Sequence, residues 1–164
     1  MGLDMYLYKK TYVQNWDDMT PSEKHQITVK KNNKPVKHIK PARITYITEQ
    51  VGYWRKVNAI HDWFVKNVQN GVDECQEAHV ELEKLIELKM LCEQVLADHS
   101  LAKTLLPCAD GFFFGYDHTN EDANYTEWYF QGLQDTVKII EELENEIEPG
   151  NDYIEGDLYY HSSW

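Results

Sequence analysis

The sequence lacks the features that mark membrane, secreted or disulfide-bonded proteins. No apolar run approaches the roughly 18 residues that a transmembrane helix needs, and the first residues have no signal-peptide pattern. The three cysteines, Cys75, Cys92 and Cys108, are an odd number without CxxC spacing. Such cysteines predict free thiols in a reducing compartment. We therefore expect a cytoplasmic protein that does not contact a membrane.

Motifs that name a reaction are also missing. The chain has no nucleophile elbow and no Walker loop. Its cysteines and histidines lack the short paired spacing of zinc sites, the scattered residues being Cys75, His79, His99, Cys108 and His118. We expect neither a metal nor a cofactor, and we assign no catalytic residue. An acid–base pair between His61 and Asp4, Glu49 or Asp62 is the remaining catalytic interpretation, so enzymatic activity stays open although binding is favoured.

The composition predicts one folded domain over residues 1–164. Apolar residues make up 42% of the chain and aromatic residues 13%, with eleven Tyr and five Trp. A chain of this length can bury a core without disulfide or metal support. Tyr and Trp combine a large apolar body with a polar group, and they are enriched on surfaces that bind a partner.

Basic residues are scarce in the second half of the chain. Residues 1–70 hold 12 Lys and Arg against 6 Asp and Glu, whereas residues 71–164 hold 4 against 22. The halves therefore carry net charges of +6 and −18, which together give the total of −12. Either an acidic face meets a basic partner, or a basic arm meets an anion, or the two halves neutralise each other across the fold.

Hydrophobic periodicity predicts alternating strands and helices. We expect strands over residues 2–9, 75–80 and 153–164, a hairpin over residues 26–39, and helices over residues 42–69, 81–98 and 125–147. The turn Asn32-Asn33 supports the hairpin, whose lysines fit either a protected sheet edge or an anion-contacting arm. In the last helix the expected inward residues are Trp128, Leu133, Val137, Ile140 and Leu143. The fold class is α+β, in which a small, mostly antiparallel sheet formed by the N-terminal strand, the hairpin and the C-terminal strand packs against three main helices.

The stretch from Tyr53 to Phe64 carries the candidate site. On a helical period, Trp54, Asn58 and His61 share one face, where a purely structural helix would place aliphatic residues. Asn58 and His61 are either satisfied polar groups in the core or they face a pocket. Arg and Lys bind phosphate, aromatic rings stack on bases and Asn reads a base edge. The predicted ligand-binding residues are Trp54, Arg55, Lys56, Asn58, His61, Trp63, Phe113 and Tyr160.

Three blocks of the chain resemble a known family. The chain opens Met1-Gly2-Leu3-Asp4-Met5-Tyr6-Leu7, carries Trp54-Arg55-Lys56-x-Asn58-x-Ile60-His61 and closes Ser162-Ser163-Trp164. Together they resemble a family of small uncharacterised proteins of bacteriophages and prophages. The resemblance implies a phage-related protein in the cytoplasm of a bacterial host. That family has no established chemistry, so no catalytic role is carried over.

Two functions follow as hypotheses. The first is a non-enzymatic phage accessory protein that binds or sequesters a small anionic molecule, such as a host nucleotide signal. The alternative is an acidic protein that mimics nucleic acid and inhibits a host defence protein. The expected partner is thus a small anion or a host protein. Direct binding of nucleic acid is not expected, and the sequence is compatible with an oligomer.

Overall fold

Two sheets and one layer of helices make up the fold. We describe it from a computed structural model that covers residues 2–110, 116–117 and 119–164. The strands are β1 (Asp4–Tyr12), β2 (Lys30–Lys31), β3 (Lys34–Pro35), β4 (Tyr46–Arg55), β5 (Ala78–Val80) and β6 (Asp157–Ser163). The helices are α1 (Asn58–Asn67), α2 (Leu82–Ala97), α3 (Ala102–Leu105) and α4 (Glu127–Glu144). Short 3-10 turns span Pro41–Arg43, His99–Leu101 and Glu121–Asn124.

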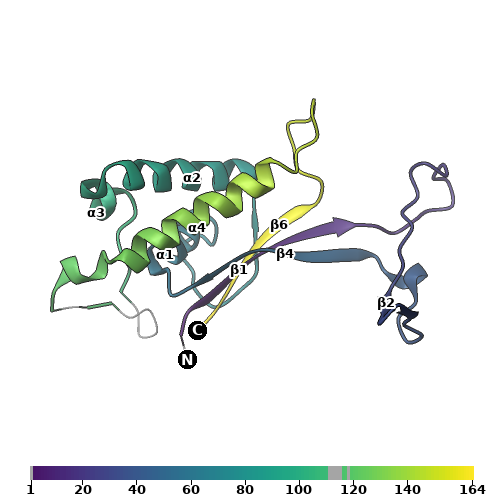
Figure 1. Cartoon of the computed structure of the whole chain (residues 1–164), viewed down its shortest axis with the longest axis horizontal. Coiled ribbons are helices and arrows are strands. Elements are labelled where there is room, and N and C mark those ends of the chain that lie inside the picture. The colour runs from purple at the N-terminus through teal and green to yellow at the C-terminus, as the bar shows by residue number, and fades with distance from the viewer. Residues whose placement is uncertain (1, 111–115, 118) are drawn as a thin grey trace.

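The main sheet has four antiparallel strands in the order β4-β1-β6-β5. Strand β1 lies near its centre and pairs with β4 on one side and β6 on the other (Figure 1). Asp4 lies opposite Ser163, so the two ends of the chain are neighbours. The sheet therefore joins segments from both ends and the middle of the sequence.

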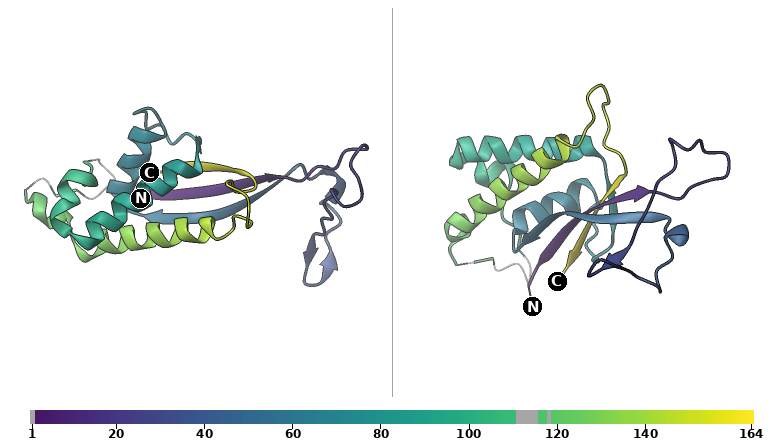
Figure 2. Two further views of the ribbon diagram at one scale, coloured as in Figure 1. Left: turned by 90° about the horizontal axis from the view of Figure 1, so that it is seen from above. Right: turned by 45° about the vertical axis from the view of Figure 1, so that its right-hand side comes forward.

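The core lies between this sheet and the helices. Leu3, Met5 and Leu7 alternate along β1 with half-buried residues and are fully buried, as the period of two in a strand requires. Every third or fourth residue of α2 is buried in the same core, the set being Leu82, Leu85, Leu88, Cys92 and Val95. The helices lie together on one side of the sheet, and α2 runs alongside α4 (Figures 1 and 2).

Glycines let α4 approach the sheet closely. A Cβ on Gly52 of β4 would lie 3.0 Å from Cγ2 of Ile139, and one on Gly132 would lie 2.6 Å from Cγ1 of Val57. Real Cβ atoms do not approach that closely, so larger residues would push α4 away. Trp54 Nε1 donates to Thr136 Oγ1 at 2.9 Å within this contact, and Thr136 Oγ1 donates to the carbonyl of Gly132 at 2.8 Å.

The helix predicted over residues 42–69 is wrong in its first half. Residues 46–55 form strand β4, and only Asn58–Asn67 is α-helical. The segment is rich in β-branched and aromatic residues, which favour strands, and its pairing with β1 supplies the hydrogen bonds. Trp54 therefore reaches the core from a strand and does not share a helical face with Asn58 and His61.

The hairpin is confirmed at its turn but does not join the main sheet. Asn32 and Asn33 have φ values of 51° and 60°, as a tight hairpin turn needs. Strands β2 and β3 form a separate two-stranded sheet, shorter than the predicted hairpin. In the main sheet, β4 and β5 occupy the positions that the hairpin was expected to fill. Strands β1 and β4 continue as a long ribbon, and the hairpin lies at the far end of this ribbon (Figure 1).

The remaining elements agree with the sequence to within a few residues. The strands at both ends, the short strand at Ala78–Val80 and helices α2 and α4 are present, so the α+β fold class is confirmed. In α4, Leu133, Ile140 and Leu143 are buried as predicted, but Trp128 is 84% exposed. No helix in the described part of the chain is long and apolar enough to cross a bilayer.

Candidate functional site: a cavity between two helix starts

A tight turn between β4 and α1 builds one wall of the site. Lys56 has a φ of 59°, in the left-handed region that non-glycine residues rarely adopt. Its backbone N–H donates to the carbonyl of Leu3 at 2.8 Å, which holds the turn against β1. The chain can therefore leave the strand at Arg55 and begin a helix at Asn58. Strain of this kind costs of order 1–3 kcal/mol and is concentrated at functional sites.

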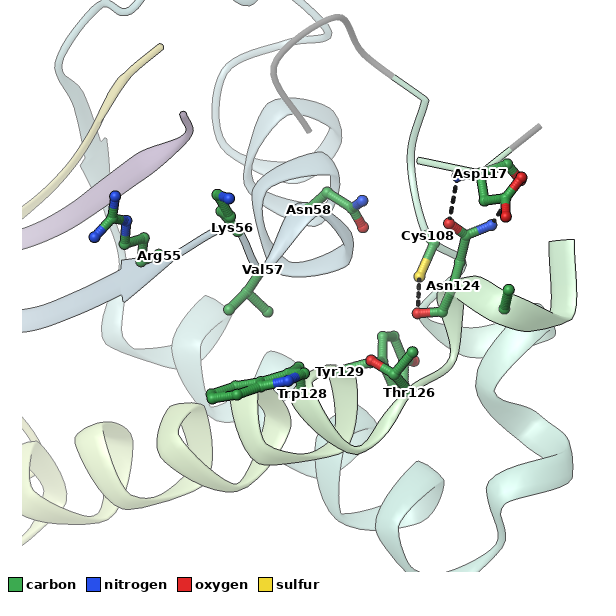
Figure 3. A pocket seen from close by; sticks show the side chains of 11 residues that line it. Arg55, Lys56, Val57, Asn58, Cys108, Asp117, Asn124, Thr126, Trp128 and Tyr129 are labelled. Carbon is green, nitrogen blue, oxygen red and sulfur yellow. Dashed lines mark hydrogen bonds between the residues drawn. The ribbon is translucent and has the colours of Figure 1, made fainter. Parts of the chain in front are cut away.

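This turn faces the beginning of α4 across a cavity of about 610 Å³ (Figure 3). A volume of this size falls within the range that small-molecule sites occupy. Its walls come from the β4–α1 turn, the segment around Cys108 and the start of α4. The lining residues are Arg55, Lys56, Val57, Asn58, Cys108, Asp117, Ala123, Asn124, Thr126, Trp128 and Tyr129.

Both helices present their N-terminal ends to the cavity. The residues that precede them, Val57 before α1 and Thr126 before α4, line it, and neither of these two N-cap residues caps its helix with a side-chain hydrogen bond. The first N–H groups of a helix have no partner inside it and carry a partial positive charge. Two such ends at one cavity favour an anion.

Two cations add to the positive charge of the helix N-termini at the cavity. The Arg55 side chain is 67% exposed, and its Nε lies 3.9 Å from Asp4 Oδ1, a long and weak contact. Lys56 forms no ion pair with any residue that the structure describes. The one carboxylate among the described residues of the lining, that of Asp117, accepts hydrogen bonds from the backbone N–H groups of Thr119 and Asn120.

The opposite wall is held in place by hydrogen bonds. The Tyr129 hydroxyl donates to the carbonyl of Leu106 at 2.8 Å, and the Cys108 backbone N–H donates to the Tyr125 hydroxyl at 3.2 Å. Asn124 accepts from the Asp117 backbone N–H at 2.7 Å. Burial raises the pKa of Cys108 to about 11, so its thiol is protonated at neutral pH.

Trp128 stands at the rim of the cavity. It lies in the first turn of α4, next to Thr126 in the lining, and its ring is largely exposed to solvent. Figure 3 shows the indole lying below Val57, on the α4 side of the cavity. An exposed indole provides a flat apolar surface on which a ring can stack.

Of the eight residues predicted from the sequence, three line this cavity: Arg55, Lys56 and Asn58. Four belong to the core, namely Trp54, His61, Trp63 and Tyr160. Phe113 lies outside the described residues. Sequence reasoning missed Val57, Cys108, Asp117, Asn124, Thr126 and Tyr129, and it placed Trp128 in the core. In α4 the buried residues Tyr129, Leu133, Thr136 and Ile140 recur at helical spacing, and Trp128 lies outside this stripe. This spacing could have shown from the sequence that Trp128 is not a core residue.

His61 belongs to a buried network and not to the cavity lining. It is 1% exposed, its Nδ1 lies 2.7 Å from the Tyr160 hydroxyl, and its Nε2 lies 2.9 Å from Asp73 Oδ2. In the tautomer in which Nε2 donates to Asp73, Nδ1 accepts a hydrogen bond from the Tyr160 hydroxyl. Trp164 Nε1 donates to the other Asp73 oxygen at 3.2 Å. Burial raises the pKa of Tyr160 well above its usual value, so this hydroxyl remains a donor.

This network replaces the catalytic pairs considered from the sequence. The carboxylate beside His61 is Asp73, whereas Asp62 pairs with Lys66 at 2.5 Å and Asp4 accepts from the Tyr53 hydroxyl. Phe64 stacks on Tyr160 with ring centroids 3.9 Å apart, which closes the network on the core side. It joins α1, β6 and the loop between α1 and β5, and thereby fixes the helix that carries the cavity wall.

No group of three or more potential metal ligands occurs among the described residues. No protein family, curated protein or solved structure with which we compared the chain matches it. The geometry of the cavity therefore carries the functional argument.

Proposed function

We propose that this protein binds a small anionic ligand, of the nucleotide class, in the cavity between the β4–α1 turn and the start of α4. One observation carries the proposal: two helix N-termini, whose N-cap residues Val57 and Thr126 make no side-chain cap, and two cations, Arg55 and Lys56, line the same cavity. Backbone N–H groups and a guanidinium are the usual partners of phosphate. The phosphate group of the ligand is expected to lie beside these backbone N–H groups and the Arg55 guanidinium.

The rest of the lining suits a nucleoside. Trp128 offers an exposed ring for stacking a base, and Asn58, with a side chain that can both donate and accept, lies across the cavity from it. The cavity of about 610 Å³ has room for a mononucleotide or dinucleotide.

Binding without catalysis fits this lining best. Its described residues include no histidine, and the raised pKa of Cys108 removes the thiolate that nucleophilic attack requires. Together with the resemblance to small phage proteins, this favours an accessory protein that sequesters a nucleotide in the cytoplasm of the bacterial host.

Calorimetric titration tests this function. The purified protein is titrated with nucleoside monophosphates, cyclic nucleotides, cyclic dinucleotides and the matching nucleosides. We expect at least one phosphorylated compound to bind and its nucleoside to bind far more weakly. Arg55→Ala removes one phosphate partner, whereas Lys66→Ala removes an exposed cation outside the cavity and serves as the control. Equal binding by the Arg55 and Lys66 variants would contradict the site, and failure of every phosphorylated compound would contradict the function.

A further inference from the structure

Residues 13–45 form an arm that extends away from the helices at the far end of the β1–β4 ribbon (Figures 1 and 2). Val13, at its base, is the one buried residue of the arm. The two-residue strands β2 and β3 are its only strands, and an isolated hairpin is at best marginally stable in water. The arm therefore has no core of its own to hold its shape.

The arm is basic, and its charges are unpaired. It carries seven Lys and Arg against three Asp and Glu, a net charge of +4, which leaves −16 on the rest of the chain. The seven cations are all exposed, and none forms an ion pair with a described residue: Lys24, Lys30, Lys31, Lys34, Lys37, Lys40 and Arg43. The cations of the arm therefore do not neutralise the acidic second half of the same chain through ion pairs.

Apolar side chains accompany these charges. Trp16 is 52% exposed, and Ile39 is exposed as well. At the base of the arm, Tyr12 and Tyr46 contact each other edge to face and remain exposed, beside Ile47. Exposed apolar residues interspersed with cations are typical of a surface that contacts a partner.

The outer side of the helical layer has the opposite charge. Helices α2 and α4 carry exposed acids that form no ion pair with a described residue, namely Glu83, Glu93 and Glu141, and Glu93 and Glu141 lie near the same lysine of α2, Lys89. Met90 lies exposed among the acids of α2, so this face also offers an apolar contact. The arm cannot reach the face of its own chain, because the β1–β4 ribbon carries it away from the helices.

We propose that the arm docks on the α2–α4 face of a second copy of this chain. Two copies related by a two-fold axis exchange arms reciprocally, which closes the assembly at a dimer. Charge complementarity selects this partner, because the −16 on the rest of each chain repels a polyanion such as nucleic acid but attracts the arm of another copy. Docking also covers Trp16 and Ile39.

Molar mass measured by light scattering after size exclusion tests the proposal, at low and at high salt. We expect a dimer at low salt that dissociates as salt screens the contact. Lys30→Glu with Lys34→Glu reverses two arm charges and should give a monomer. Lys66→Glu with Lys103→Glu changes the net charge equally outside the arm and should remain dimeric. The arm residues lie outside the core, so thermal unfolding should be the same for both variants.

A charge-swap experiment completes the test. Glu93→Lys with Glu141→Lys should also be monomeric at low salt, and mixing it with the Lys30/Lys34 variant should restore a dimer, because both arm–face contacts are then complementary. A wild-type protein that is monomeric at low salt overturns the proposal, as does a dimer that survives reversal of the arm charges. Nucleic acid that co-purifies with the wild type, and is lost on arm reversal while the protein itself stays monomeric, overturns it in favour of a nucleic-acid partner.

Discussion

The stretch from Trp54 to Trp63 divides into two sets of residues with opposite environments. Trp54, His61 and Trp63 are buried in the core, whereas Arg55, Lys56 and Asn58 line the cavity. The division arises because Trp54 and Arg55 are neighbours on a strand, where successive side chains point to opposite faces, and because Lys56 then reverses the chain direction through a left-handed turn. Residue type alone does not separate a tryptophan of the core from a tryptophan of a binding site.

The two tryptophans Trp54 and Trp128 give the largest contrast. Trp54→Ala removes a buried ring and its hydrogen bond to Thr136, and we expect it to lower the free energy of unfolding by about 3–5 kcal/mol. Trp128→Ala removes an exposed ring, so stability should change by less than about 0.5 kcal/mol while ligand affinity falls. Urea denaturation measures the first effect and calorimetric titration the second. A marked loss of stability in the Trp128 variant would place that ring in the core after all.

A substitution at Lys56 can lower the affinity of the cavity for an anion without disturbing the fold. Lys56→Gly removes the ammonium group but keeps the turn, because glycine adopts a φ near 60° without penalty. We expect a loss of about 1.5–3 kcal/mol in binding an anion, or tenfold or more in Kd. The measurement is a titration with the best nucleotide ligand, with Lys66→Ala as a control for loss of an exposed cation, since alanine preserves helix α1. Undiminished affinity in the Lys56 variant would remove this cation from the site.

The network around His61 should matter for stability alone. Tyr160→Phe removes the hydroxyl that lies 2.7 Å from His61 Nδ1, and loss of this buried hydrogen bond should cost about 1–2 kcal/mol. Ligand affinity should not change at temperatures where the variant is folded. Denaturation and titration of the same preparation check both statements. A loss of binding with no loss of stability would assign Tyr160 to the site, as the sequence predicted.

The smallest effect concerns pH and the buried thiol of α2. Burial raises the pKa of Cys92 from its ordinary value of 9.0 to about 12. Because the folded pKa is raised, this contribution to stability is fully present below pH 9 and is lost as pH rises toward 12. The stability advantage of the wild type over Cys92→Ala should therefore shrink between pH 9 and pH 11 in urea denaturation. An advantage that is constant across that interval would contradict the assigned burial.

Much of the fold can be read from the sequence because it is local. The alternation Leu3–Met5–Leu7, the stripe of α2 and the Asn32-Asn33 turn each depend on residues close together in the chain. Strand β4 was missed because it pairs with β1, whose residues are distant in the sequence, from Tyr12 opposite Tyr46 to Asp4 opposite Arg55. Spacing of apolar residues by three or four over residues 44–54 fits a helix as well as it fits this strand.

The candidate site was predicted only on one side. Arg55, Lys56 and Asn58 lie close together in the sequence, so one motif identified them all. The opposite wall, with Thr126 and Trp128, is contributed by a helix about seventy residues away, and its placement depends on the close contact at Gly132. No local pattern contains that information.

Native mass spectrometry of the protein purified from bacterial cells, before and after denaturation, tests the central claim most directly. The proposed function predicts that the wild type releases a small molecule of nucleotide mass and that Lys56→Gly, purified in the same way, does not. A wild-type mass equal to that of the polypeptide alone, unchanged after a panel of nucleotides is added in excess, would contradict it.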